Sequence, residues 1–151
     1  MENLSIVCKE FLSCAFSPMN EQHLVTLSGE GDWCAIMWQW GDQFKMLAKV
    51  DLHVMDPVEP LTFQISLANI MSDMVCVVTG TSTYKYMKLE DKGRSFREMH
   101  SQLVARNRGD AVSTNYTCHA WAKDKVQLVV CTAEGDILVC AMSGEFLIYI
   151  P

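Results

Sequence analysis

The chain has 151 residues, of which 50% are apolar, so it has the length of one ordinary domain and enough apolar side chains for a core. Its 12 basic and 18 acidic residues give a net charge of −6, which argues against a dedicated nucleic-acid-binding protein, because such proteins neutralise phosphates with basic side chains. No apolar run approaches the roughly 20 residues of a membrane span, and the N-terminal segment lacks the apolar centre of a secretory signal. We therefore expect neither nucleic acid nor a membrane among the partners.

In chain order, the sequence shows short apolar stretches, rich in β-branched and aromatic residues and separated by turn signals, which is typical of all-β proteins. The first group of predicted strands comprises Phe11–Pro18, Leu24–Gly29, Trp33–Trp40 and Phe44–Val50. The second group comprises Leu61–Ala68, Met74–Gly80 and Thr83–Leu89. The third group comprises Tyr116–Lys123, Val126–Gly135, Asp136–Met142 and Gly144–Ile150.

The three groups repeat one another. We align Phe16 with Ile65 and Trp121 in the first strands, and Trp38 with Met87 and Cys140 in the third strands. A period of about 50 residues made of four short strands is typical of a propeller blade. The third strand of the first group is apolar on both faces, which indicates that other sheets cover it on both sides.

The predicted fold class is therefore an all-β propeller segment of about three four-stranded blades that form an incomplete ring. We place the blades at about 9–52, 58–100 and 113–151, with a connecting loop or short helix at 90–114. Known propellers use about four to eight blades. We therefore expect a piece of a larger propeller, a short alternative product, or a chain completed by another copy or partner. We also expect poor solubility or self-association through exposed blade faces.

The segment Gly29–Asp32 (GEGD) lies between two predicted strands and is either a phosphate-binding loop or a hairpin turn. A phosphate cradle requires G-x-x-x-x-G-K-[ST] before a helix, whereas here no lysine follows, acidic side chains repel phosphate, and a strand comes next. Glycine and aspartate tolerate the positive φ angles of tight hairpins. We predict a turn at Gly29–Asp32, and an equivalent turn that contains Glu134 and Asp136.

The connection Glu90–Thr114 is the most individual segment, because it holds five of the 12 basic residues. These are Lys92, Arg94, Arg97, Arg106 and Arg108. The first interpretation is an outer strand followed by a solvated loop. Ser95 and Glu98 have the spacing of a capping box, so a short amphipathic helix is the second. A third is a basic contact to an acidic partner, either the acidic tails of tubulin or, less compatible with the acidic chain, RNA.

The histidines and cysteines give no catalytic, cofactor-binding or metal site. Neither a G-x-S-x-G elbow nor an H-E-x-x-H motif accompanies His23, His53, His100 or His119. Cys118 and His119 are adjacent on a predicted strand, so their side chains point to opposite faces. We therefore interpret His119 as a hydrogen-bonded histidine of that strand rather than as a catalytic or metal-binding residue. The seven cysteines form no close C-x-x-C pair, so we interpret them as buried free thiols in a reducing compartment. We predict no enzyme activity and no cofactor.

Three stretches carry a resemblance to a known family. These are KEFLSCAFSP with LVTLSGEGDWCAIMWQW, then VCVVTG with YKYMKL, and then NYTCHAWAKDK with VVCTAEGDILV. In this order they resemble the N-terminal propeller of the cilia- and flagella-associated WD-repeat proteins. The resemblance implies a non-enzymatic scaffold in the cytoplasm and cytoskeleton, at the axoneme of cilia or flagella. It also implies protein partners such as axonemal dynein or doublet-microtubule proteins, and a role in docking inner-arm dyneins for motility.

Two other functions remain open from the sequence alone. The chain is compatible with a generic cytoplasmic WD-repeat scaffold, or with a non-functional short fragment of a longer protein. An enzyme whose site lies in further blades is a third class, although no motif of the sequence favours it.

Overall fold

The computed structural model describes residues 8–41, 43–54, 62–70, 72–101, 115–122, 127–141, 143 and 146–150. These residues form β-strands and connecting turns, and the described part of the chain contains no helix. The strands form three antiparallel sheets of four strands each, and in every sheet the strands follow one another in chain order. The predicted all-β class of three four-stranded units in an incomplete ring is confirmed.

Each sheet is built from consecutive segments of the chain. The first sheet consists of β1 (Phe11–Phe16), β2 (His23–Ser28), β3 (Cys34–Gln39) and β4 (Lys45–Asp51). The second sheet consists of β5 (Phe63–Ile70), β6 (Asp73–Gly80), β7 (Thr83–Glu90) and β8 (Ser95–His100). The third sheet consists of β9 (Tyr116–Trp121), β10 (Gln127–Thr132), β11 (Ile137–Ala141) and β12 (Phe146–Ile150).

The predicted alternative of a short helix is wrong over Ser95–His100. This segment pairs with β7, with Ser95 opposite Glu90 and His100 opposite Tyr86. The backbone groups of β7 require hydrogen-bond partners, and an extended neighbour supplies them whereas a helix bonds to itself. The remainder of the connection, from Gln102 onward, lies outside the described residues.

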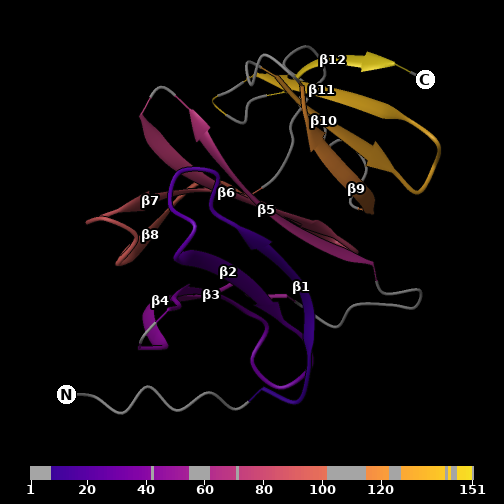
Figure 1. Cartoon of the computed structure of the whole chain (residues 1–151). Coiled ribbons are helices and arrows are strands. Elements are labelled where there is room, and N and C mark those ends of the chain that lie inside the picture. The colour runs from indigo at the N-terminus through magenta and orange to yellow at the C-terminus, as the bar shows by residue number, and fades with distance from the viewer. Residues whose placement is uncertain are drawn as a thin grey trace.

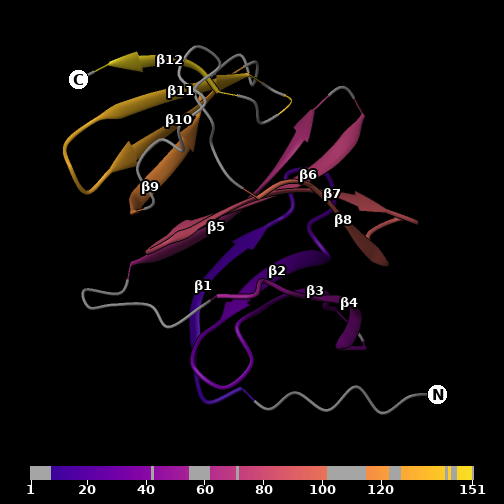
Figure 2. The ribbon, with the colours of Figure 1, turned by 180° about the vertical axis from the view of Figure 1, so that it is seen from behind.

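The second sheet lies between the other two, as the two opposite views show (Figures 1 and 2). The first strands of the sheets are neighbours, because β1 contacts β5 and β5 contacts β9. We call the face that a sheet turns toward the preceding sheet its leading face, and the opposite face its trailing face. The trailing face of the first sheet thus packs on the leading face of the second, and the same relation joins the second sheet to the third.

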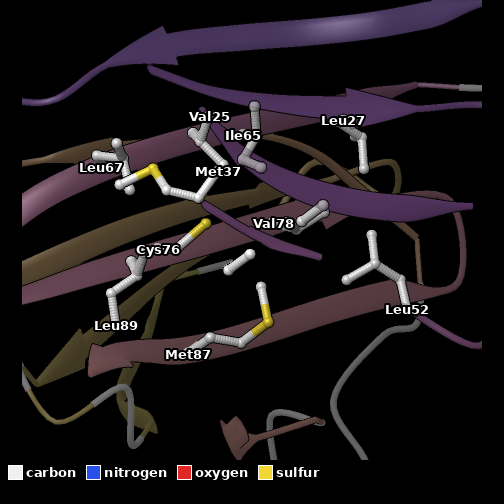
Figure 3. Packing of buried hydrophobic residues seen from close by; sticks show 12 residues of the cluster. Val25, Leu27, Met37, Leu52, Ile65, Leu67, Cys76, Val78, Met87 and Leu89 are labelled. Carbon is white, nitrogen blue, oxygen red and sulfur yellow. The ribbon is translucent and has the colours of Figure 1, made fainter. Parts of the chain in front are cut away.

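The contact between the first and second sheets is a continuous apolar core. Val25, Leu27 and Met37 come from the first sheet, and Cys76 and Val78 come from the second. All five are fully buried, and Figure 3 shows their side chains converging between the two sheets. Burial of each such side chain contributes about 1.5–3 kcal/mol, so this core fixes the first two sheets as one unit.

A second core fills the space between the second and third sheets. The second sheet contributes Val77, Tyr84 and Tyr86, and the third sheet contributes Leu128 and Val130. Because the second sheet has a core on each face, β6 and β7 are buried almost throughout their length. This explains why their sequences do not alternate strictly between apolar and polar residues.

The pairing registers define which residues are equivalent in the three sheets. In each sheet a β-bulge interrupts the pairing of the third and fourth strands, immediately before Trp38, Met87 and Cys140 respectively. The predicted equivalence of these three residues is therefore confirmed. Residues that lie opposite one another on neighbouring strands form a row across the sheet. The row that contains Trp38 ends at Phe16 in β1, and the row that contains Cys140 ends at Trp121 in β9.

In the second sheet the same row leads from Met87 through Cys76 to Leu67. The predicted equivalence of Ile65 with Phe16 and Trp121 is therefore wrong by two residues. The error kept the side chain on the correct face, because side chains in a strand alternate with a period of two. The bulge that identifies the register depends on strand pairing and has no signature in the sequence.

The segment Gly29–Asp32 forms the turn between β2 and β3, as predicted. Gly31 has a φ angle of 120°, which side-chain-bearing residues rarely adopt. Asp32 accepts hydrogen bonds of 2.7 Å from the Ser28 hydroxyl and of 2.7 Å from the Lys49 ammonium group. Ser28 in turn accepts a hydrogen bond from the Cys34 backbone N–H. The acidic residue thus ties the turn to β4.

Candidate protein-interaction surfaces

Large apolar side chains are exposed at one end of the first sheet. We call Phe16, Met19, Trp40 and Phe44 the aromatic end; these side chains are 58%, 62%, 44% and 64% exposed. The rings of Phe16 and Trp40 lie 5.7 Å apart at an interplanar angle of 58°. Aromatic residues are enriched at the centres of protein–protein interfaces, so this end has the chemistry of a docking surface.

The aromatic end is held in place by the two connections that form it. The Trp40 backbone N–H donates to the Gln22 carbonyl oxygen at 2.7 Å, and its indole N–H donates to the Glu21 carbonyl oxygen at 2.6 Å. Residues 20–22, with Trp40 and Gly41, line an open depression of about 380 Å³. Because the indole is oriented before any partner arrives, binding there costs less side-chain entropy than ordering a free tryptophan would.

Trp38 lies beside this end but is buried. Its indole N–H donates to the Thr26 hydroxyl at 2.8 Å, and its ring stacks on Phe44 with 4.8 Å between centroids. The prediction that both faces of this strand are buried is confirmed for Cys34 through Trp38. It is wrong for Trp40, which lies beyond the strand's end, where no second sheet of the described chain covers it.

The trailing face of the third sheet is the other exposed apolar surface. Its described side chains come from β9, β10 and β11. They are Cys118, Ala120, Val129, Cys131, Ile137 and Val139, all of them exposed or partly exposed. Ile137 is 39% exposed. Contiguous apolar surfaces of this kind mark interaction sites.

His119 was the strongest candidate for chemistry, and it is a buried structural residue. Its ring nitrogens lie 2.6 Å from the Ser66 hydroxyl and 2.7 Å from the Thr79 hydroxyl, both in the second sheet. The side chain is 5% exposed, and burial lowers the pKa of the imidazole to about 4. A neutral imidazole donates through one nitrogen and accepts through the other, so the two hydroxyls satisfy it. The predicted interpretation of a hydrogen-bonded strand histidine is confirmed.

The remaining candidates do not converge. Cys118 is exposed on the face opposite to that of His119, as their adjacency on a strand predicts. His53 is exposed, and His100 packs on the ring of Tyr86. Within the described ranges, no three His, Cys, Asp or Glu side chains form a group that could hold a metal ion.

The acidic residues of the turns are tied to their own sheets. Asp32 is partly buried beside Lys49, and Glu134 and Asp136 lie in or next to the turn between β10 and β11. Burial by itself raises the pKa of the Asp32 carboxyl, but the hydrogen bonds from Lys49 and Ser28 together hold that pKa below its usual value. A carboxylate kept ionised in this way stabilises the turn.

The prediction of uniformly buried cysteines is only partly correct. Cys34, Cys76 and Cys140 are buried, whereas Cys14 and Cys118 are exposed. The two exposed thiols occupy the leading face of the first sheet and the trailing face of the third. Periodicity places them correctly on apolar faces, but the sequence does not reveal that no second sheet of the described chain covers those faces.

The described part of the basic segment is partly neutralised. Arg97 pairs with Glu90 through a contact of 2.8 Å, and Lys92 and Arg94 lie in the turn between β7 and β8. Arg106 and Arg108 lie outside the described residues. The structure therefore gives Arg97 a role in joining β7 to β8. In the described ranges, no helix is long and apolar enough to cross a membrane.

Comparison with known proteins gives a curated relative and solved structures of similar fold, while no protein-family model matches the chain. The chain is 23% identical, over 186 aligned residues, to the Cilia- and flagella-associated protein 57 C of Tetrahymena thermophila. The alignment covers 92% of this chain but 14% of that protein, so the chain spans about one seventh of its relative.

One solved structure of similar fold is the C-terminal WD40 domain of Sif2. The TM-score is 0.58 with 14% sequence identity, and the match covers 96% of this chain and 38% of that one. This likeness concerns the fold, and it agrees with the three four-stranded sheets described above. The chain therefore has the fold of an incomplete WD40-type β-propeller, and it is similar in sequence to a cilia- and flagella-associated protein.

Proposed function

We propose that the chain is a non-enzymatic protein-interaction scaffold of the ciliary or flagellar axoneme, and that it helps to dock inner-arm dyneins on doublet microtubules. The similarity to a cilia- and flagella-associated protein across 92% of the chain is the observation that carries the proposal. A sheet array of this kind is rigid, and its exposed surfaces bind proteins through a few buried anchors.

The aromatic end supplies the anchors. Phe16 and Trp40 are exposed and in contact with each other, and tryptophan is among the residue types that contribute most to binding energy. We propose that a protein partner of the axoneme covers this pair. The wider binding role follows from the WD40 fold, whereas the identity of the partner rests on the ciliary relative.

The test is the location of the protein in detergent-extracted cilia, with an antibody raised against Lys92–Asp110. A band in the axonemal fraction is the expected result. Its apparent mass shows whether the 17.0 kDa chain itself or a longer product is docked. A band confined to the cytoplasm would contradict the ciliary role and favour a general WD-repeat scaffold.

A paired variant tests the aromatic end. Trp40→Ser is expected to lower retention in the axonemal fraction at least tenfold, because one buried anchor contributes about 1.4 kcal/mol or more. Met99→Ser is the matched control, since Met99 is 45% exposed on β8 of the second sheet. Equal loss in both variants would refute the assignment of the aromatic end.

A further inference from the structure

The two contacts between sheets are built in the same way. They can therefore be compared with the two remaining faces, which are the leading face of the first sheet and the trailing face of the third. In the first contact the Ile65 backbone N–H donates to the Ser13 hydroxyl at 3.2 Å. In the second contact the His119 backbone N–H donates to the Gln64 side-chain oxygen at 2.8 Å. By the registers, Ile65 is equivalent to His119 and Ser13 to Gln64. One hydrogen bond between sheets is thus repeated at equivalent positions.

The side chains around this hydrogen bond are chemically matched in the first contact. Ile65 on the leading face of the second sheet belongs to the same core as Ala15 and Leu27 on the trailing face of the first. All three are apolar, so no polar group at this position is deprived of a partner.

In the second contact the same three positions are all polar. His119 takes the place of Ile65, while Ser66 takes the place of Ala15 and Thr79 that of Leu27. The two hydroxyls hydrogen-bond the imidazole ring. The polarity of the residue on the leading face and that of its two partners on the trailing face therefore change together from the first contact to the second.

The two faces against which the described part of the chain packs no further sheet carry a third matched set. On the leading face of the first sheet, the position of Ile65 and His119 is taken by Cys14. On the trailing face of the third sheet, Ala120 and Cys131 take the positions of Ser66 and Thr79, and Cys118 takes that of Gln64. All four are small side chains without charge, as the apolar first contact requires. A polar leading residue such as His119 would find no partner on this trailing face.

The exposures differ as expected for an interface that is not yet formed. Val25 and Met37 on the trailing face of the first sheet are fully buried, whereas their equivalents in the third sheet, Val129 and Val139, are partly exposed. The difference arises because the second sheet covers only the first pair.

The leading faces differ in the same direction at the positions of Phe16 and Trp40, whereas Cys34, Ile36 and Trp38 on the leading face of the first sheet are buried within that sheet's own cluster. Phe16 is 58% exposed and its equivalent Leu67 8%. Trp40 and Leu89 are also equivalent, because each lies two residues after the residue that follows the bulge. Trp40 is 44% exposed, whereas Leu89 is 6% exposed. On the leading face of the first sheet, Asp32 and Lys49 neutralise each other, whereas Asp51, which pairs with Cys34, is exposed.

We propose that the trailing face of the third sheet in one copy of the chain packs on the leading face of the first sheet in a second copy. Cys14 of one copy then lies against Ala120 and Cys131 of the other, continuing the relation that joins the sheets within the chain. The contact is head-to-tail, so it closes into a ring or extends into a filament according to its rotation. This contact also covers Phe16 and Trp40, so it competes with the axonemal partner proposed for the aromatic end; its tests on the isolated chain do not depend on the ciliary role.

Cross-linking of the native thiols tests the geometry. A mixture of unlabelled and ¹⁵N-labelled chains is treated with a short bismaleimide, and the linked peptides are identified by mass spectrometry. Links between Cys14 of one isotope and Cys118 or Cys131 of the other are expected. Links only between two Cys14 residues, or no link between isotopes, would overturn the proposal.

Two blocked variants test the direction of the contact. Cys14→Lys blocks the leading face and Ala120→Lys blocks the trailing face; both positions are exposed, so the fold tolerates the change, which circular dichroism verifies. In light scattering each variant alone is expected to be monomeric, whereas an equimolar mixture forms a dimer through the one intact pair of faces. The control Met99→Lys associates as the unmodified chain does. A monomeric unmodified chain, or association of either blocked variant alone, would overturn the proposal.

Discussion

The imidazole of His119 in the third sheet forms a hydrogen bond of 2.7 Å with the hydroxyl of Thr79 in the second sheet. Both side chains are at most 5% exposed, and the second ring nitrogen is occupied by Ser66 at 2.6 Å. The bond thus joins two sheets inside an otherwise apolar core. Buried polar groups are costly when left without partners, so this cluster specifies which face of the third sheet turns toward the second.

Replacing His119 by alanine is expected to destabilise the chain by about 2–4 kcal/mol, because it removes the partner of the buried Thr79 hydroxyl and of the partly buried Ser66 hydroxyl and opens a cavity. The measurement is the midpoint and slope of denaturant unfolding. Thr117→Ala is the control, since Thr117 is exposed on the same strand, and surface changes cost about 0.5 kcal/mol or less. Equal effects of the two substitutions would show that the cluster contributes nothing specific.

Acidification is expected to destabilise the fold through His119. Burial lowers the pKa of this imidazole from 6.5 to about 4, so between these values the unfolded chain binds a proton that the folded chain does not. Stability is therefore fully present above the unfolded pKa and is lost as the pH falls toward the folded pKa. Between about pH 7 and pH 5 the expected loss is on the order of 2 kcal/mol.

The matched variant for this prediction is His119→Gln, in which the loss over the same pH range is expected to be smaller by that amount. His23, whose pKa is also lowered by burial, is present in both proteins and cancels in the comparison. Asp32 has a pKa lowered from 3.8, so its contribution disappears only at more acidic pH. Identical pH profiles for the two proteins would contradict a neutral buried His119.

The Asp32–Lys49 ion pair is expected to couple the β2–β3 turn to β4. The two side chains are only 14% and 23% exposed, so solvent screens them less than a surface pair. Asp32→Asn and Lys49→Met are each expected to cost about 1–2 kcal/mol, and the double variant less than their sum, because each single change strands a partly buried charge. Additive free energies of unfolding would show that the pair is not coupled.

The two neighbouring tryptophans are expected to respond differently to substitution. Trp38→Phe removes the indole N–H that binds Thr26 inside the first sheet, at an expected cost of about 1–2 kcal/mol. Trp40→Phe concerns a side chain that is 44% exposed, and we expect a change of about 0.5 kcal/mol or less. Thermal unfolding of both variants measures the contrast. A larger effect at Trp40 would mean that the aromatic end stabilises the fold rather than a complex.

Much of the fold could be predicted from local patterns. Three groups of short apolar stretches with turn residues between them predict eleven of the twelve strands, and the turn at Gly29–Asp32 follows from residue types that tolerate positive φ angles. Ser95–His100 was ambiguous, because six residues with capping-box spacing and a plausible strand pattern fit either structure. The pairing of this segment with β7 shows that it is a strand.

The sequence by itself determined the number of sheets, their strand order and the face on which each apolar side chain lies, because these depend on spacing within a few residues of the chain. The tertiary structure alone decided which faces are covered. The alternation of side chains along a strand places Val25 in the first sheet and Val129 in the third on equivalent faces, but Val25 is buried against the second sheet whereas Val129 is partly exposed. The same alternation places Phe16 at an exposed end of its sheet. Val25 is buried because a neighbouring sheet covers it, and whether such a sheet is present is a property of the assembled fold rather than of any local stretch of sequence.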